Sequence, residues 1–194
     1  MIILGSQSPR RKEILNFFSI PFTQVASHFD EASIPMHSDP ASYAKLLATK
    51  KAEVLQEQFK NKIILCADTV VYHQKKIYNK PSDKKEAKQF LSELSGSWHE
   101  VITALCVVFG DKIICEVETT QILFNPLSED QIESYLSHFA FSDKAGGYAI
   151  QQGGGIIVKK IEGCYYNVMG LPINTLAKVL KEVDIDLWKH LKIF

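Results

Sequence analysis

The residues best suited to chemistry begin close to the N-terminus, where cations crowd an expected helix start. Ser8-Pro9-Arg10-Arg11-Lys12 follows a short apolar run. Ser8 suits a helix N-cap and Pro9 suits the first helical position. Three cations in a first turn oppose the helix macrodipole, which favours negative charge there. Because free backbone N–H groups and arginine side chains bind anions together, the pattern indicates a phosphate site, with a solvated basic turn as the alternative.

An acidic residue inside an apolar run provides a second candidate. Residues 62–72 are almost continuously apolar, and Asp68 interrupts them beside Thr69. A buried carboxylate is costly unless it is paired or binds a cation. Ligands gather at the carboxyl ends of strands in α/β folds, where such carboxylates bind metals or activate water. We therefore expect Asp68 to act in catalysis or metal binding; an aspartate satisfied by a loop at the strand end is the alternative.

Three more charged residues could serve the same site, two lysines as cations for the anion and one carboxylate for a metal. Lys80 is followed by Pro81, which restricts its backbone, and presents a point charge. Lys51 follows Lys50 on a long helical pattern, and only one of the two can face a shared site. Glu31 is a candidate second carboxylate for Mg²⁺, which takes one or two carboxylates together with phosphate oxygens and water. The alternative for each is a solvated surface residue, which is the more common place for a lysine such as Lys80.

A glycine-rich segment could approach a ligand closely. Asp143-Lys144-Ala145-Gly146-Gly147-Tyr148-Ala149-Ile150-Gln151 contains two adjacent glycines, which permit close backbone approach. Tyr148 could stack on a base or fill the core. The amide of Gln151 can both donate and accept hydrogen bonds, as recognition of a base edge requires. A purely structural loop is the alternative, and Gly153-Gly154-Gly155 lacks the Gly-Lys-Ser/Thr ending of a P-loop.

The elements that must position these residues alternate between strand and helix patterns, which predicts an α/β fold. The expected strands cover residues 2–5, 62–72, 75–78, 98–109 and 112–124, the last two joined as a hairpin at Gly110-Asp111. The expected helices cover residues 9–18, 40–59, 83 to about 96, 128 to about 139 and 172 to about 183. Residues 21–39 and 143–155 are expected to be loops, residues 156–168 a β-hairpin, and the tail 184–194 a helical segment packed through Leu187, Trp188, Leu191 and Phe194.

The composition limits the class of protein. The chain of 194 residues is expected to form a single domain over residues 1–194, and an apolar share of 46% predicts a packed core. Lys plus Arg equals Asp plus Glu at 22 each, which argues against a general nucleic-acid or membrane binder. No apolar run approaches a membrane span and no secretory signal is visible, so we expect a cytoplasmic protein. The four cysteines lie far apart and are expected to be reduced, and no zinc motif is present.

Taken together, the motifs resemble those of the Maf family of nucleoside triphosphate pyrophosphatases. They keep the family's order and span nearly the whole chain, as Ser6-Gln7-Ser8-Pro9-Arg10-Arg11, Ala67-Asp68-Thr69-Val70-Val71, Lys80-Pro81, Leu94-Ser95-Gly96 with His99, Val101 and Thr103, and the segment 143–151. The resemblance implies a mixed twisted β-sheet flanked by helices, with two lobes around a nucleotide cleft, as in inosine triphosphatases. It also implies hydrolysis of a nucleoside triphosphate to the monophosphate and pyrophosphate by a water that a divalent cation, Mg²⁺ or Mn²⁺, activates.

The resemblance assigns roles to individual residues. Asp68 would be the proton acceptor and, with Glu31, would support the metal. The phosphates would be held by Ser8, Arg11, Lys51 and Lys80. Substrate choice would depend on Arg10, Thr69 and Gln151, which match the branch that prefers dTTP and UTP rather than the branch that prefers 7-methyl-GTP. A homodimer is compatible with the family.

The chain departs from the family pattern at two positions. Gly5 replaces the usual alanine, and Gln152 stands where a glycine commonly follows Ile150-Gln151, which could narrow the base pocket. Two other functions remain open from the sequence. One is a non-catalytic nucleotide-binding regulator of cell division or septum formation, and the other is a phosphatase that releases orthophosphate.

Overall fold

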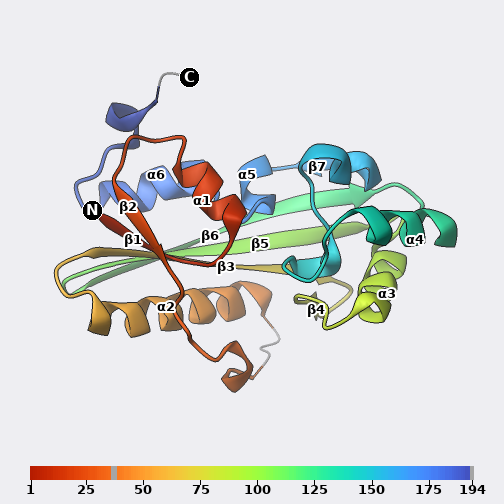
Figure 1. Cartoon of the computed structure of the whole chain (residues 1–194), viewed down its shortest axis with the longest axis horizontal. Helices are drawn as coiled ribbons and strands as arrows, with labels where there is room; N and C mark the ends of the chain where they lie inside the picture. Colours follow the sequence, from red (N-terminus) through yellow and green to blue (C-terminus); the bar gives the residue numbers. More distant parts are fainter. Residues whose placement is uncertain (36–38, 193–194) are drawn as a thin grey trace.

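A mixed β-sheet forms the centre of the molecule, in a computed structural model that describes residues 1–35 and 39–192 (Figure 1). Within these ranges the sheet has seven strands: β1 (Ile2–Gly5), β2 (Phe22–Val25), β3 (Ile63–His73), β4 (Lys76–Tyr78), β5 (Trp98–Phe109), β6 (Lys112–Phe124) and β7 (Val158–Glu162). The strand order is β2-β1-β3-β5-β6-β7, and β4 pairs with β3. The pairs β2–β1 and β1–β3 are parallel and the others antiparallel. The expected mixed α/β architecture is confirmed.

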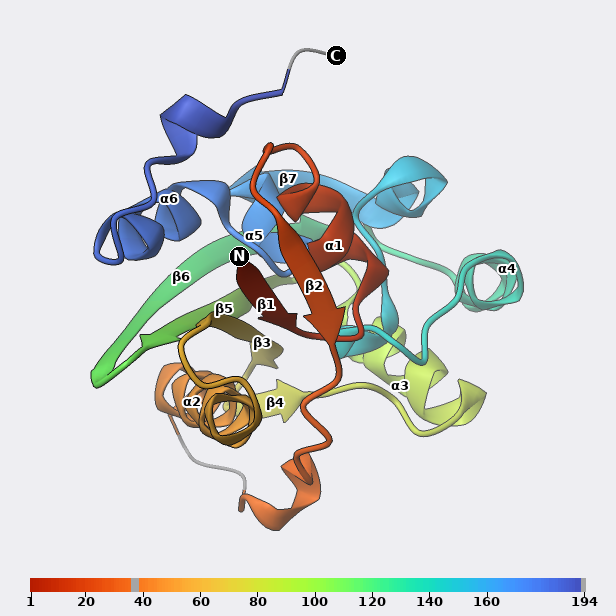
Figure 2. The same ribbon diagram turned by 60° about the vertical axis from the view of Figure 1, so that its left-hand side comes forward.

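Helices cover both faces of this sheet (Figures 1 and 2). The long helix α2 (Pro40–Gln58) covers one face, whereas the other face carries α1 (Pro9–Leu15), α5 (Tyr165–Val168) and α6 (Ile173–Lys181). The pair α3 (Lys84–Leu94) and α4 (Glu129–His138) packs together at one end of the sheet. Short 3₁₀ turns follow the chain at η1 (Glu31–Ser33), η2 (Ala145–Gly147), η3 (Gln152–Ile157) and η4 (Leu187–His190).

The alternation of side chains along the central strand decides which residues meet which helix. On β3, Ile64 and Val70 join the hydrophobic cluster under α2, and Leu65 and Val71 join the cluster on the opposite face. Successive side chains of a strand point to opposite faces. Asp68 therefore lies on the α2 face, and its neighbour Thr69 lies on the face that α1 covers.

Local sequence signals place the ends of two helices correctly. Asp83 accepts a hydrogen bond from the Glu86 backbone N–H at the start of α3. Ser128 and Gln131 form the expected reciprocal capping box at the start of α4. Such caps satisfy backbone donors that the first helical turn leaves unpaired.

Three expectations about local structure are wrong. Residues 22–25 form β2 rather than loop, because the edge of β1 supplies backbone hydrogen bonds that a short, half-exposed segment does not specify by itself. The segment 156–168 is no hairpin: its one strand, β7, pairs with the distant β6, and the chain then turns into α5. The helix expected over 9–18 ends at Leu15, with turns after it.

The tail packs less completely than its helical spacing indicates. Leu187 is buried in the core, but Trp188 is 81% exposed and Leu191 58% exposed. Leu191 instead forms an isolated β-bridge with Phe18. Phe194, the fourth residue of that prediction, lies outside the described residues.

Candidate active site

A cleft of about 830 Å³ brings together residues that lie far apart in the sequence. Its walls come from the β1–α1 loop, the segment around Glu31, α2, β3, the segment after β4 and the loop after α4. All the site residues expected from the sequence line it: Ser8, Arg10, Arg11, Glu31, Lys51, Asp68, Thr69, Lys80 and Gln151. The cleft is therefore lined by cations from several elements and contains a buried acid, Asp68.

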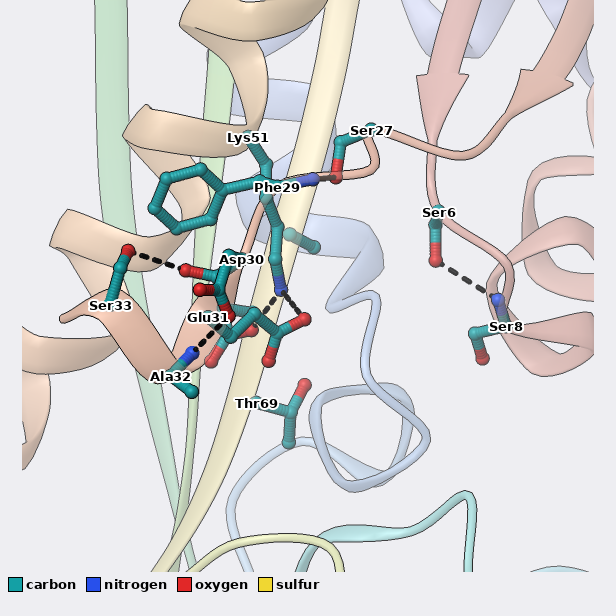
Figure 3. Close-up of polar contacts among 12 residues, drawn as sticks. Ser6, Ser8, Ser27, Phe29, Asp30, Glu31, Ala32, Ser33, Lys51 and Thr69 are labelled. Atoms are coloured by element: carbon teal, nitrogen blue, oxygen red, sulfur yellow. Dashed lines mark hydrogen bonds and ion pairs between the residues drawn. The ribbon is translucent and has the colours of Figure 1, made fainter.

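The buried acid is paired with a lysine from α2. Lys51 Nζ donates a hydrogen bond of 2.5 Å to Asp68 Oδ1, and the side chains are only 8% and 9% exposed. The same ammonium lies 2.8 Å from Glu31 Oε1 (Figure 3). Lys51, and not Lys50, faces the site, since Lys50 pairs with Glu53 instead. One cation thus holds two carboxylates at the cleft.

Burial and nearby charges have opposite effects on the pKa values of Asp68, Lys51 and Glu31. Burial raises the pKa of Asp68, and Lys51 and Arg11 oppose that rise. Burial also acts to lower the pKa of Lys51, but Asp68 and Glu31 outweigh it and raise that pKa. The pKa of Glu31 is lowered, because Lys51 outweighs the effect of its partial burial. Asp68 is therefore more basic than an exposed aspartate, as a proton acceptor requires.

The η1 turn presents Glu31 to the lysine. Asp30 begins this turn: its carboxylate accepts a hydrogen bond from the Ala32 N–H, and its carbonyl accepts one from the Ser33 hydroxyl (Figure 3). These bonds fix the turn locally, although the sequence predicted only a loop here. Glu31 remains 43% exposed and can meet a ligand.

Glu31 and Asp68 could supply only part of the coordination shell of a divalent cation, and the rest would have to come from other ligands. Glu31 and Asp68 converge on one position, which the Lys51 ammonium shares. Among residues 1–35 and 39–192, no group of three or more His, Cys, Asp or Glu side chains could hold a metal. Mg²⁺ in nucleotide sites takes one or two carboxylates and completes its shell with phosphate oxygens and water. The donor set suits a cation that arrives with a polyphosphate.

Arg11 is half-buried and links three parts of the chain through hydrogen bonds. Its Nε donates to Gly170 O at 2.8 Å, Nη1 donates to Ala67 O at 2.9 Å and Ser6 Oγ at 3.2 Å, and Nη2 donates to Thr69 Oγ1 at 3.0 Å. Burial lowers the pKa of this guanidinium, against the opposing effect of Asp68. These bonds use most of its N–H donors. Arg11 thus forms the cleft wall, a role that its sequence context did not reveal.

Arg10 contacts the loop after α4, which is another part of the cleft wall. Its Nη1 lies 2.6 Å from Asp143 Oδ2, and its Nη2 donates to Asp143 O at 3.1 Å. Lys144 Nζ lies 2.5 Å from Asp143 Oδ1. The pKa of Asp143 is lowered, because these two cations outweigh its partial burial. Asp143 and Lys144 belong to the glycine-rich motif, but their sequence context predicted no individual role for them in the site.

The remaining expected site residues differ in how tightly they are held. Ser8 occupies the N-cap position of α1, but within the described chain its side chain makes no capping bond. Lys80 is exposed at the cleft. Thr69 Oγ1 lies 2.9 Å from Thr103 Oγ1, which donates in turn to Asn167 O. Gln151 Oε1 is buried and has no hydrogen-bond partner in residues 1–35 and 39–192.

Tyr148 fills the core rather than offering a free ring for stacking. It is 5% exposed, and its hydroxyl lies 2.8 Å from His99 Nε2. Its ring meets Phe124 edge-on at 4.7 Å between centroids. Burial lowers the pKa of His99 to about 3. Tyr148 lines the cleft, so this buried pair forms part of the cleft wall.

The departure at Gly5 has a steric cause. A Cβ at this position would lie 2.3 Å from Cys66 Sγ and 2.5 Å from Leu55 Cδ1. Those side chains occupy the space that an alanine methyl group would need. The glycine is therefore matched to its neighbours in this chain, and β1 stays close to β3 at the cleft.

Comparison with known proteins agrees with the motifs. A model of the family described as "Maf-like protein" matches residues 1–183. The "dTTP/UTP pyrophosphatase" of Chlamydia caviae is 48% identical over 191 residues, which cover 98% of this chain and 97% of that protein. The protein of the same name from Chlamydia trachomatis serovar D is 44% identical, and a "Nucleoside triphosphate pyrophosphatase" of Chlamydia muridarum is 42% identical, each with the same coverage.

Similarity to solved structures is weaker. The Staphylococcus aureus Ham1 protein aligns over 94% of this chain and 98% of its own, with a TM-score of 0.48 and 13% sequence identity, which is too little to argue from. In the part of the chain that the structure describes, no helix has the length and apolar character to cross a membrane. The family match over residues 1–183 and the relatives above 40% identity decide the assignment, and the chain belongs to the Maf-like protein family.

Proposed function

We propose that this protein hydrolyses nucleoside triphosphates, with dTTP and UTP preferred, to the monophosphate and pyrophosphate. The observation that carries the proposal is the buried Asp68–Lys51 pair in a cleft lined by cations. A polyphosphate needs several positive groups, and a hydrolase needs a proton acceptor beside them. Three similar proteins carry names that state nucleotide pyrophosphatase activity.

The chemistry requires little covalent participation by the protein. A water attacks the α-phosphorus, and pyrophosphate leaves. Asp68 accepts the proton of the water, and its raised pKa makes that transfer more favourable than for an exposed aspartate. Lys51 holds the carboxylate in place and contributes positive charge to the phosphates. Positioning and charge neutralisation supply most of the rate enhancement in such reactions.

A divalent cation, Mg²⁺ or Mn²⁺, belongs to the proposal. Glu31 and Asp68 would hold it together with the phosphates, and when bound it would neutralise phosphate charge and polarise water. Ser8, Arg11 and Lys80 line the same cleft and would complete the phosphate contacts. Arg11 can contribute only with the donor capacity that its four protein hydrogen bonds leave.

The preference for dTTP and UTP is supported by the acceptor on Gln151. Its Oε1 is buried and unpartnered in the described chain, which is costly until a ligand donates to it. Thymine and uracil carry an N3–H donor, whereas cytosine has a bare N3 acceptor. Arg10 and Thr69 border the same cleft and would complete the choice of base.

The setting of the activity is part of the same proposal. The single continuous sheet supports one domain over residues 1–194. Four free cysteines suit the reducing cytoplasm. A balanced charge supports a small nucleotide substrate rather than a nucleic-acid polymer.

The test is product identification with a panel of triphosphates. Purified protein is incubated with dTTP, UTP, CTP and 7-methyl-GTP, with Mg²⁺ or Mn²⁺, and pyrophosphate, orthophosphate and nucleotide products are separated. We expect pyrophosphate and the monophosphate, fastest from dTTP and UTP, and loss of turnover on chelation. Binding without turnover would instead support the non-catalytic regulator, and orthophosphate release would support a phosphatase.

A further inference from the structure

Three cysteines occupy one row across the centre of the sheet. Cys106 on β5 lies directly opposite Cys66 on β3 and, on its other side, directly opposite Cys115 on β6. Directly paired residues on neighbouring strands point to the same face. All three pack in or against the hydrophobic cluster under α2. Cys164 is the fourth cysteine, and within the described chain all four are free thiols.

The distance between Cys106 and Cys115 depends on which residue pairs of the β5–β6 hairpin are hydrogen-bonded and which are not. A two-residue turn joins Phe109 to its partner Lys112, and Gly110 has the positive φ of 57° that such turns use. The residues that flank a two-residue turn form a hydrogen-bonded pair, and the pair type alternates along the strands. Cys106 and Cys115 lie three pairs further on, so they form a non-hydrogen-bonded pair.

This pair type is the one in which a disulfide fits. In a non-hydrogen-bonded pair the Cα atoms are about 4.5 Å apart and the side chains are closer than in the other type. A disulfide requires Cα atoms about 4.4–6.8 Å apart and Cβ atoms about 3.5–4.5 Å apart. The Cys106–Cys115 pair therefore meets the requirement with little backbone movement.

The same alternation of pair types makes Cys66 and Cys106 less suited to form a disulfide. Because the backbone groups of Cys106 do not pair with β6, they point toward β3, and Cys66–Cys106 is a hydrogen-bonded pair with more widely spaced side chains. The three thiols do not make a metal site either, since no group of three or more ligating side chains converges within residues 1–35 and 39–192. Cys106 and Cys115 remain as the reactive pair.

The environment of Cys115 favours its thiolate. It is half-buried at the rim of the cluster, and its Sγ lies 3.2 Å from Thr49 Oγ1 on α2. Hydrogen bonding with Cys106 and Thr49, with help from nearby Lys45, lowers the pKa of Cys115 despite burial. Hydrogen bonding with Cys115 and burial raise the pKa of Cys106, so that thiol stays protonated. A thiolate beside a protonated, buried partner is the arrangement of an attacking and a resolving cysteine.

We propose that Cys106 and Cys115 form a redox-active pair that a hydroperoxide converts to a disulfide and a dithiol converts back. The Cys115 thiolate attacks the terminal oxygen of the hydroperoxide; the O–O bond breaks, and sulfenic acid and an alcohol result once the alkoxide takes a proton from solvent. The sulfur of Cys106 then attacks Cys115 sulfur, the S–O bond breaks, and hydroxide leaves as water with the Cys106 proton. Two thiols lose two electrons, and the hydroperoxide is reduced by two. The site is independent of the proposed hydrolysis.

The test uses the folded full-length protein and hydrogen peroxide as the oxidant. After a short exposure, free thiols are alkylated, and the protein is digested without reductant and analysed by mass spectrometry. We expect a cross-linked peptide pair that contains Cys106 and Cys115, lighter by two hydrogen atoms than the free peptides and lost on treatment with dithiothreitol. In Cys106→Ala, where resolution is blocked, dimedone should label Cys115 as its sulfenic acid.

Matched variants make the outcome decisive. Cys115→Ser should abolish the cross-link, whereas Cys164→Ser, which removes a half-buried cysteine elsewhere, should leave it unchanged. Circular dichroism verifies that each variant is folded. A Cys66–Cys106 cross-link, dimedone labelling of Cys164 ahead of Cys115, or unmodified Cys115 in folded protein would each overturn the proposal.

Discussion

Lys51 Nζ donates a 2.5 Å hydrogen bond to Asp68 Oδ1, and both side chains are buried. The bond joins the helix on one face of the sheet to the strand at its centre. Removing one member of a buried ion pair leaves the other charge uncompensated, which costs more than the pair itself contributes. Glu31 also contacts Lys51 and can partly compensate a change at Asp68. Asp68 can therefore be replaced while Lys51 keeps a partner in Glu31, and we expect the fold to tolerate that change.

Replacement of Asp68 by asparagine tests the proton acceptor. Asp68→Asn keeps the size of the side chain and leaves Lys51 paired with Glu31, so we expect the fold to survive. The rate constant kcat for pyrophosphate release should fall about 100- to 10,000-fold, the usual contribution of a positioned general base. Asp111→Asn, at the exposed hairpin turn, serves as the control and should leave turnover unchanged. Full activity in Asp68→Asn would exclude the assigned role.

The charge on Lys51 should control the pH profile. Lys51 lowers the pKa of Asp68 against the effect of burial. In Lys51→Met this influence is lost, so the pKa of Asp68 rises further and less of the carboxylate is ionised at neutral pH. The acid limb of kcat/KM should move to higher pH, with activity partly recovered as the pH is raised. Lys50→Met, which removes a half-exposed neighbour, should not move that limb; equal shifts in both variants would contradict the argument.

Arg11 should affect stability and kinetics together. Arg11→Lys keeps a positive charge but loses the planar fork that contacts Gly170, Ala67, Ser6 and Thr69. Hydrogen bonds of charged groups contribute about 1.5–3 kcal/mol each. We expect the free energy of unfolding in urea to fall by about 2–4 kcal/mol. In the folded fraction KM should rise and kcat should fall.

The kinetic part of that prediction has its own control. Lys12→Arg changes the adjacent exposed cation and should alter neither the urea midpoint nor the kinetic constants. If Arg11→Lys loses stability while KM and kcat stay at their wild-type values, Arg11 supports the cleft wall and takes no part in binding phosphate.

His99 should make the fold sensitive to acid. Its pKa is lowered from 6.5 to about 3 by burial, so the unfolded chain binds a proton that the folded protein excludes. Its contribution to stability is complete above about pH 6.5 and decreases as the pH falls toward 3. At pH 5 the loss should be about 2 kcal/mol. His99→Gln keeps a hydrogen-bonding group for Tyr148 but has no proton to gain, so its free energy of unfolding should fall less between pH 7 and pH 5; parallel curves would refute the mechanism.

The residue types and their periodicity were sufficient to predict much of this protein. The almost continuous apolar run over 62–72 predicted a central strand, and the capping signals at Asp83 and Ser128 predicted two helix starts, because these signals are local in the sequence. The motifs also identified nine residues that line the proposed site, although not Asp143 and Lys144, since a basic turn and a buried acid are unfavourable without a ligand or partner.

The tertiary structure decided the features that depend on distant partners. Gly170 is 159 positions from Arg11, and only the folded chain shows that the arginine links the two. The docking angle of α2 selects Lys51 over Lys50 for contact with Asp68. Residues 22–25 and 158–162 became edge strands because β1 and β6 offered unpaired backbone groups there. Backbone pairing at a sheet edge is almost independent of side-chain type, so residue types alone do not predict such edge strands.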